Sequence, residues 1–549
     1  MSSRFMKGAL ILSLSTVLAR LLGLIYIVPF EALVGPGGLA LYAYAYGPYS
    51  FFLMLSTLGI PVGIAKFIAK YNADGEYDTS RRIYQFGLLF MIILGIVSFL
   101  IMYFGAPIFA NMVISRSENT YNTFEDVVSV IRVVSFAIIV IPPMSIMRGF
   151  FQGNQDMSPT AVSQVIEQLV RVILIVIGAY IVVRFIPHGN VQMAVRLSVF
   201  AAFIAGIAAL IVLNRYWVKN RKKFNDLLSL STIHEPRSMK KLFLELLSYA
   251  LPFAILSIAA TLFQLIDLVT FNRGMVQAGV DMKLSEQIMG IYSTSLSKIV
   301  MIPVSFAIAF GQPLVTELTE KMRIKDMKSV HQTLSTALVL TSFITVPAVI
   351  GMSLLSSPIY VLLFNRSLEI NQIGGQIFGF GAFIGLFLAF NSITAAVIQG
   401  IGRHYQALIY LAIAAVIKLV GNIILIPIFQ VNGAILSTLL AFGFCIILNY
   451  FEIRKTTGIQ TRFIIKRHLS ILSFTGVMSI TVGFTIYILN LFLDYSTSRG
   501  IALIYVTIAG IVGVVVYFGL AFYFDLTKQL FGDRLSIKRI FKRIGRRKT

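Results

Sequence analysis

Residues 126–183 read DVVSVIRVVSFAIIVIPPMSIMRGFFQGNQDMSPTAVSQVIEQLVRVILIVIGAYIVV. Two almost uninterrupted apolar runs, 126–150 and 160–183, stand on either side of a short polar turn. A helix needs about 20 mostly apolar residues to cross the ~30 Å hydrocarbon core of a bilayer. Both runs are long enough, so this stretch predicts two membrane-spanning helices joined by a tight turn.

The same pattern recurs along the whole chain of 549 residues, of which 57% are hydrophobic and 13% are charged. A soluble protein carries about 25% charged residues, so a set of soluble globular domains is excluded. The sequence predicts an all-α integral membrane protein with fourteen transmembrane helices. The predicted spans lie near 8–32, 40–69, 82–106, 126–150, 160–183, 191–215, 244–270, 287–312, 331–356, 371–398, 404–427, 431–451, 467–491 and 499–524.

The basic residues test this count independently, because loops on the cytoplasmic side of a membrane are enriched in Lys and Arg. With the N-terminus inside, thirty-four of the 46 basic residues fall on the cytoplasmic side, six fall outside and six lie within spans. The first apolar run contains Arg20 and has no small-residue cleavage site, so we interpret it as a retained span rather than a signal peptide. Both termini are therefore expected in the cytoplasm.

A weak internal repeat organises the spans. Gln152-Gly153 matches Gln399-Gly400 at an offset of 247 residues, and Arg171 falls on Lys418 at the same offset. Six spans separate the equivalents, so both copies enter the membrane in the same direction. We predict two parallel six-helix lobes plus two C-terminal helices. The expected domains are the N-lobe 1–215, a cytoplasmic basic linker 216–243, the C-lobe 244–452, helices 13 and 14 in 453–525, and a basic cytoplasmic tail 526–549.

Charged residues within spans are costly, so each is a candidate functional residue. The candidate cations near helix middles are Arg20, Arg171, Lys298 and Lys418. Glu167 lies four residues before Arg171, so the two can pair on one helix face. That pair is either a structural ion pair or part of a cavity. The excess of cations over carboxylates suits an anionic cargo, because phosphates need fixed positive partners where the dielectric is low.

Other chemistry is missing from the sequence. It contains no P-loop and no Ser/His/Asp arrangement, and its five histidines lack the spacing of metal ligands. We therefore expect a secondary transporter with no cofactor and not an enzyme. The basic tail predicts contact with anionic inner-leaflet lipids and no nucleic-acid binding.

The stretch Arg148-Gly149-Phe150-Phe151-Gln152-Gly153-Asn154-Gln155-Asp156-Met157-Ser158-Pro159-Thr160-Ala161, continuing from Ser163 to Val172, resembles the polysaccharide-exporter branch of the MOP superfamily. Within that branch the chain resembles Gram-positive MurJ-type lipid II flippases and their sporulation relatives. Gly35 to Tyr42 and Gln399-Gly400 with Arg403 support the resemblance, which covers essentially the whole chain.

The resemblance implies a cationic cavity between the lobes and a groove for a polyprenyl tail along helices 13 and 14. The family keeps an arginine in an Arg-x-x-Gly pattern in span 1, which Arg20 and Gly23 match. A second cation stands five residues before the span 8 proline, where Lys298 precedes Pro303. Two further arginines of the family fall on Tyr26 and near Leu53, so the cavity is less positive unless Arg171 and Lys418 compensate.

The resemblance also implies a sodium site for some members, joining spans 7, 11 and 12. Asp267, Asn422 and Thr438 are the matching candidates, and Na⁺ is then the candidate coupling ion. The acidic residue expected one turn after Asn422 is Ile426 instead. This replacement leaves the set one carboxylate short.

The resulting hypothesis is a flippase of the bacterial plasma membrane. It would move undecaprenyl-diphosphate-linked lipid II from the inner to the outer leaflet by alternating access. We expect a monomer that works beside the cell-wall synthesis machinery. The alternatives are a flippase for another undecaprenyl-linked glycan, such as teichoic-acid or capsule units, and a cation-coupled drug exporter. A membrane scaffold without transport is disfavoured, because it would have no need of mid-bilayer cations.

Overall fold

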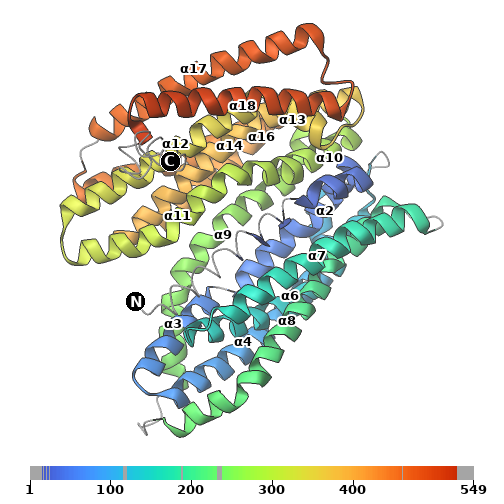
Figure 1. Ribbon diagram of the computed structural model, residues 1–549. Helices are drawn as coiled ribbons and strands as arrows, with labels where there is room; N and C mark the ends of the chain where they lie inside the picture. The colour runs from blue at the N-terminus through green and yellow to red at the C-terminus, as the bar shows by residue number, and fades with distance from the viewer. Residues whose placement is uncertain are drawn as a thin grey trace, which may run out of the picture. The chain divides into compact units, whose positions relative to one another are not determined.

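The computed structural model describes residues 15, 18–19, 22–23, 25–57, 59–114, 120–186, 190–231, 238–459 and 462–527. Helices make up nearly all of these residues, and none of them lies in a strand. The helices are α2 Ile27–Thr57, α3 Ile60–Ala73, α4 Tyr77–Phe104, α5 Ala106–Val113, α6 Phe124–Gly153, α7 Ser158–Phe185, α8 Val191–Ser229, α9 Met239–Gln277, α10 Met282–Gly290, η1 Ile291–Leu296, α11 Ser297–Arg323, α12 Met327–Leu354, α13 Ser356–Leu363, α14 Leu368–Gly400, α15 His404–Phe429, α16 Val431–Thr457, α17 Arg462–Phe492 and α18 Arg499–Tyr523 (Figure 1).

Twelve helical segments of the described residues are long and apolar enough to cross a membrane. One of them, Met282–Ser305, runs through α10, η1 and the start of α11. The prediction of an all-helical, multi-span membrane protein is confirmed. Two predicted spans have no counterpart among the twelve: 8–32, part of which lies outside the described residues, and 244–270, which falls inside α9.

Local breaks in the helices follow glycine and proline. Gly35 adopts φ 69°, a left-handed conformation, and interrupts α2 between the predicted ends of spans 1 and 2. Predicted span 2 is itself divided, because Gly59 adopts φ 66° and Pro61 stands in the first turn of α3. Pro61 therefore opens a new helix, where its missing N–H costs nothing.

The helices group into two compact units, Met1–Ser295 and Leu296–Thr549. In the first unit, α9 and α10 pack against α2. Gly290 makes the α10 contact possible, because a Cβ there would collide with the carbonyl oxygen of Pro36. The division thus falls after α10, whereas the repeat predicts a lobe boundary at 216–243. That predicted linker is largely helical, since α8 continues to Ser229 and α9 begins at Met239.

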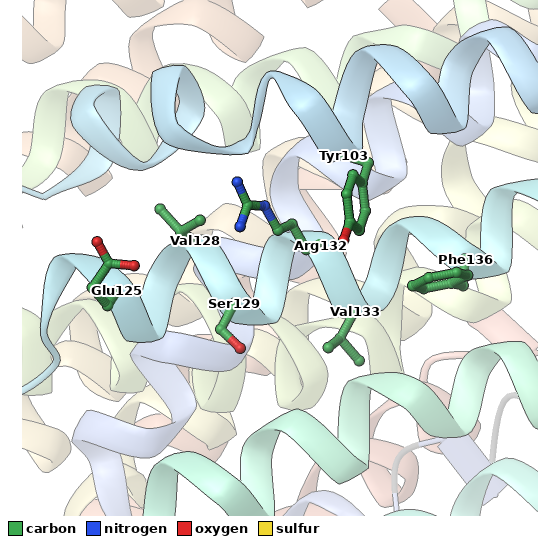
Figure 2. Close-up of a pocket in the computed structure, with 7 residues that line it drawn as sticks. All are labelled: Tyr103, Glu125, Val128, Ser129, Arg132, Val133 and Phe136. Atoms are coloured by element: carbon green, nitrogen blue, oxygen red, sulfur yellow. The ribbon is translucent and has the colours of Figure 1, made fainter.

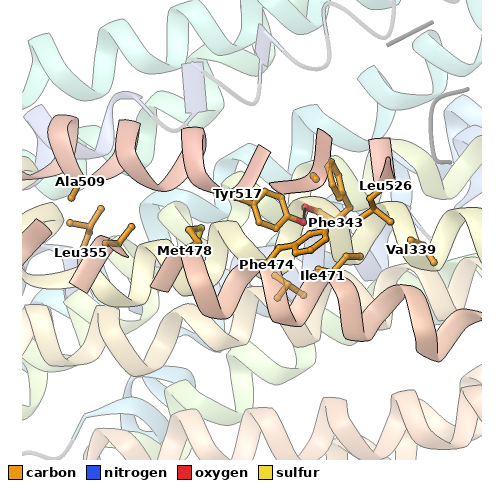
Figure 3. Packing of buried hydrophobic residues seen from close by; sticks show 12 residues of the cluster. Val339, Phe343, Leu355, Ile471, Phe474, Met478, Ala509, Tyr517 and Leu526 are labelled. Carbon is orange, nitrogen blue, oxygen red and sulfur yellow. Dashed lines mark hydrogen bonds between the residues drawn. The ribbon is translucent and has the colours of Figure 1, made fainter. Parts of the chain in front are cut away.

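In the second unit, a buried apolar cluster packs the two C-terminal helices, α17 and α18, against α12 (Figure 3). Phe343 of α12 meets Phe474 of α17 and Tyr517 of α18 in this cluster, and the Tyr517 hydroxyl donates to the Phe343 carbonyl oxygen at 2.9 Å. Helices in lipid gain no hydrophobic driving force from association, so close packing and such hydrogen bonds hold them together. Helices α17 and α18 are therefore packed against the other helices of this unit and form part of it.

Large apolar side chains cover the outer faces of both units. Ile93 of α4 and Ile177 of α7 are exposed in the first unit, and Val416 of α15, Ile480 of α17 and Val515 of α18 are exposed in the second. A soluble protein rarely presents such continuous apolar surface. In a bilayer these faces contact acyl chains, which agrees with the twelve helical segments that are long and apolar enough to cross a membrane.

Candidate functional site

The first unit contains a charged cluster built from α6 and α7. Oε1 of Glu167 pairs with Nη2 of Arg171 at 2.8 Å, and Oε2 pairs with Nη2 of Arg148 at 3.0 Å. Nε of Arg148 also donates to Oγ of Ser163 at 3.0 Å. The Glu167 side chain is 10% exposed and each guanidinium side chain 17%. One carboxylate thus holds two arginines, and the cluster keeps a net charge of one positive.

The expected pairing of Glu167 with Arg171 is present, and Arg148, which stands near the end of predicted span 126–150, binds the same carboxylate. It joins the cluster because α6 and α7 are connected by a tight turn, which brings the last turn of α6 beside the first turns of α7. The Thr160 hydroxyl closes the turn by donating to the Arg148 carbonyl oxygen at 3.3 Å. Ion-pair distance across a turn is not visible from residue spacing alone.

Tyrosines of α2 extend the polar character of this region. Helix α2 packs against α7, and Tyr46 and Tyr49 lie within electrostatic reach of Arg171. The rings of Tyr42 and Tyr46 stack with centroids 4.3 Å apart. Among the described residues, the buried hydroxyls of Tyr46 and Tyr49 and Nε of Arg171 have no hydrogen-bond partner. Buried polar groups are normally satisfied, so these groups form a place where a polar ligand or water would be favoured.

Lys298 stands at the start of α11, directly after the π-helical segment η1. It is partly exposed, and Pro303 follows it inside the helix. A π-helical turn is rare and often marks a functional site, while proline leaves a carbonyl without its helical partner. Lys298 therefore occupies an irregular stretch of helix. Arg20, the other predicted diphosphate ligand, lies outside the described residues.

Lys418 of α15 is completely buried against α16. Its Nζ donates to the carbonyl oxygen of Ala434 at 3.0 Å, to Oγ of Ser437 at 3.1 Å and to Oγ1 of Thr438 at 2.6 Å. Ser437 in turn donates to Oδ1 of Asn422. In this conformation the ammonium is enclosed between two helices, and no part of it is presented to a ligand.

Comparison with known proteins identifies the family. Residues 5–319 match the family described as "Polysaccharide biosynthesis protein", and residues 265–508 match the family described as "Lipid II flippase MurJ". The chain is 36% identical over 535 residues to "Lipid II flippase MurJ" of Bacillus subtilis (strain 168), covering 97% of this chain and 98% of that protein. The chain belongs to the MurJ lipid II flippase family. It is thus a multi-span bacterial membrane protein with transporters as its relatives.

Solved structures agree on the fold. "Lipid II flippase MurJ, inward closed conformation" matches this MurJ-family chain with a TM-score of 0.63 at 16% identity, over 94% of this chain and 99% of the other. A multidrug resistance MATE transporter of the MOP superfamily in the inward-facing conformation matches with a TM-score of 0.64, also at 16% identity, over 80% of this chain and 98% of the other. At this identity the likeness establishes a shared helical fold and nothing more specific.

The candidate sodium ligands of this MurJ-family chain fall in different units. Asp267 belongs to α9 of the first unit, where its Oδ2 accepts a hydrogen bond from the Tyr292 hydroxyl at 2.9 Å. Asn422 and Thr438 belong to α15 and α16 of the second unit, where both take part in the Lys418 network. Nζ of Lys418 already donates to the Thr438 hydroxyl, and Oδ1 of Asn422 already accepts from Ser437, so these two oxygens do not fit a sodium ion at the same place. No group of three or more His, Cys, Asp or Glu among the described residues could hold a metal ion.

Two further arginines, Arg132 of α6 and Arg196 of α8, lie in the first half of their helices. Arg196 pairs with Asp126 at 2.7 Å. Arg132 lies over the ring of Tyr103, 5.4 Å from its centroid, and lines a cavity of about 250 Å³ together with Glu125 and Phe136 (Figure 2). Arg132 thus takes part in a cation–π contact rather than an ion pair within the described part of the chain.

Proposed function

We propose that this chain translocates lipid II from the inner to the outer leaflet of the bacterial plasma membrane. The observation that carries the proposal is the Arg148–Glu167–Arg171 cluster, a surplus positive charge held within the helices of a MurJ-family chain. The diphosphate of lipid II is the part of the cargo that a low-dielectric interior most disfavours. A fixed guanidinium offsets that cost.

In this proposal Arg171 and Arg148 contact the diphosphate or hold the positive field that attracts it. Glu167 fixes their geometry, because one carboxylate can accept hydrogen bonds from two guanidinium groups. Arg20 and Lys298 supply further cations, as their match to the family pattern implies. The unpartnered hydroxyls of Tyr46 and Tyr49 provide donors for sugar or phosphate oxygens.

The proposed architecture has fourteen transmembrane helices, as two six-helix lobes and two additional helices, with both termini in the cytoplasm. The basic tail and the 34 inward basic residues support that orientation. The undecaprenyl tail stays in the lipid along the outward apolar faces of α17 and α18, where Ile480 and Val515 are exposed. We expect a monomeric transporter that acts by alternating access and performs no covalent chemistry on its cargo.

The function is tested by depleting the protein in its own host and measuring lipid II at the outer surface with a membrane-impermeant reagent. We expect outer-surface lipid II to fall as the protein is lost, while total lipid II rises. Unchanged outer-surface lipid II in a host with no second flippase would contradict the proposal. A parallel fall in teichoic-acid or capsule units alone would assign the chain to another undecaprenyl-linked glycan.

The site is tested by complementing the depleted strain with Arg171→Ala, Lys298→Ala and Arg20→Ala. Each is expected to restore less than a tenth of the wild-type flipping, with protein abundance in the membrane unchanged. Arg221→Ala, an exposed arginine on the cytoplasmic extension of α8, is the matched control and should complement fully. Full complementation by Arg20→Ala would remove that residue from the site.

A further inference from the structure

The α15–α16 interface contains a cation that belongs to the chain itself. We propose that the Lys418 ammonium takes the place of a bound sodium ion in the second unit, so that this chain binds no Na⁺ between α15 and α16. The proposal concerns the ion requirement of the transporter and holds for whichever cargo it moves. It is carried by the oxygen atoms around Nζ and by the enclosure of the side chain.

The hydrogen-bond directions around Lys418 suit a charged ammonium. Thr438 donates its hydroxyl proton to the carbonyl oxygen of Ala434 at 2.9 Å, and Ser437 donates to Oδ1 of Asn422. Both hydroxyl oxygens are therefore left to accept from Nζ, and the Ala434 carbonyl can only accept. Three acceptors thus face the three N–H groups that an ammonium carries.

These oxygens are also the kind that bind a small hard cation. Hydroxyl, carbonyl and amide oxygens are ligands for such ions in proteins, and Asn422, Ser437 and Thr438 are all buried. The interface is tight one turn further along, where a Cβ on Gly421 would meet the Cβ of Ser437. The ammonium therefore fills the oxygen cage, and a second positive charge beside it would be repelled.

The position of Lys418 explains how a charged side chain is tolerated although its burial removes the water around the ammonium. Nothing within the bilayer core replaces water around a charge except protein oxygens. The chain supplies three such oxygens from the first two turns of α16, so the cation crosslinks α15 and α16 in this conformation. A sodium ion could leave during a transport cycle, whereas this cation cannot.

The test uses the purified full-length chain in lipid nanodiscs, with thermal unfolding measured in NaCl and in choline chloride of equal concentration. Wild type is expected to unfold at the same temperature in both salts. Lys418→Ala removes the charge and leaves a space lined by the three oxygens. Its unfolding temperature should therefore be about 2–4 °C higher in NaCl than in choline chloride. Lys418→Met removes the same charge but fills the space with an uncharged chain of similar length. It should show no difference between the salts.

Several outcomes would overturn the proposal. Stabilisation of wild type by Na⁺ over choline, or saturable ²²Na⁺ binding that Lys418→Ala abolishes, would show a sodium site that coexists with the lysine. A folded Lys418→Ala variant that is indifferent to Na⁺ would show that the oxygens form no cation cage. If Lys418→Ala does not fold in either salt, wild-type ²²Na⁺ binding alone decides: its absence supports the proposal and its presence overturns it.

Discussion

Arg171 of α7 and Lys418 of α15 occupy equivalent positions in the repeat predicted from the sequence, yet the two units accommodate these cations in different ways. Arg171 is held by a carboxylate one turn earlier, remains 17% exposed and shares that carboxylate with Arg148. Lys418 has Ala414 at the position of that carboxylate, is wholly buried and donates to the neutral oxygens of Ala434, Ser437 and Thr438.

The two arrangements determine which of the cations can meet a ligand. A guanidinium with an unused Nε and partial exposure can still meet a ligand. The Lys418 ammonium has no exposed surface, and it donates three hydrogen bonds to oxygens of the neighbouring helix α16. We infer that the first unit keeps its cation for cargo and the second unit uses its cation for structure.

The largest expected effect on stability comes from Glu167→Gln. The carboxylate pairs with two guanidinium groups that are each mostly buried, and breaking a buried ion pair by removing one partner costs about 3–5 kcal/mol. Thermal unfolding of the purified protein in nanodiscs measures the change. Glu245→Gln, which breaks the half-exposed pair with Lys70 at 3.5 Å, is the matched control and should cost about 0–1 kcal/mol. Equal losses for the two variants would contradict the assigned importance of the cluster.

A smaller loss is expected from Lys418→Met. It leaves buried oxygens of α16 without their donor, and an unsatisfied buried acceptor costs about 1–3 kcal/mol. Denaturant or thermal unfolding of the same preparation gives the value. Val416→Met, on the exposed face of the same helix, should change the stability little. A loss for Lys418→Met that exceeds that of Glu167→Gln would reverse the contrast between the two units.

The smallest changes in stability are expected when single hydroxyl groups are removed. Ser437→Ala removes one acceptor of Lys418 and should cost about 1 kcal/mol. Tyr46→Phe removes a hydroxyl without a partner among the described residues, so it should leave the unfolding temperature unchanged while reducing flipping. Stabilities that fall equally in both variants would show that the Tyr46 hydroxyl is already bonded in the folded protein.

Sequence alone predicted the helical membrane fold because apolar run length and the distribution of Lys and Arg are properties of the chain itself. It also predicted the pairing of Glu167 with Arg171, since a spacing of four places both on one helix face. The predicted break between spans 404–427 and 431–451 is confirmed, and Gln430 adopts φ 54° there between α15 and α16.

Contacts between helices were not predictable in the same way. The ion pair between Arg148 and Glu167 was not predicted, because the distance between them depends on how α6 turns into α7. Lys418 and Arg171 are equivalent in the sequence, and only the packing of α16 shows that one is enclosed. The division after α10 likewise depends on α9 and α10 packing against α2, which no repeat offset reveals.

The different roles of the two cations are tested by measuring outer-surface lipid II in cells depleted of the native protein and supplied with Arg171→Ala or with Lys418→Met, normalised to folded protein in the membrane. We predict that Arg171→Ala lowers flipping at least tenfold per molecule, whereas Lys418→Met retains flipping within about twofold of wild type. Loss of flipping in Lys418→Met with full flipping in Arg171→Ala would contradict the assignment of the two cations.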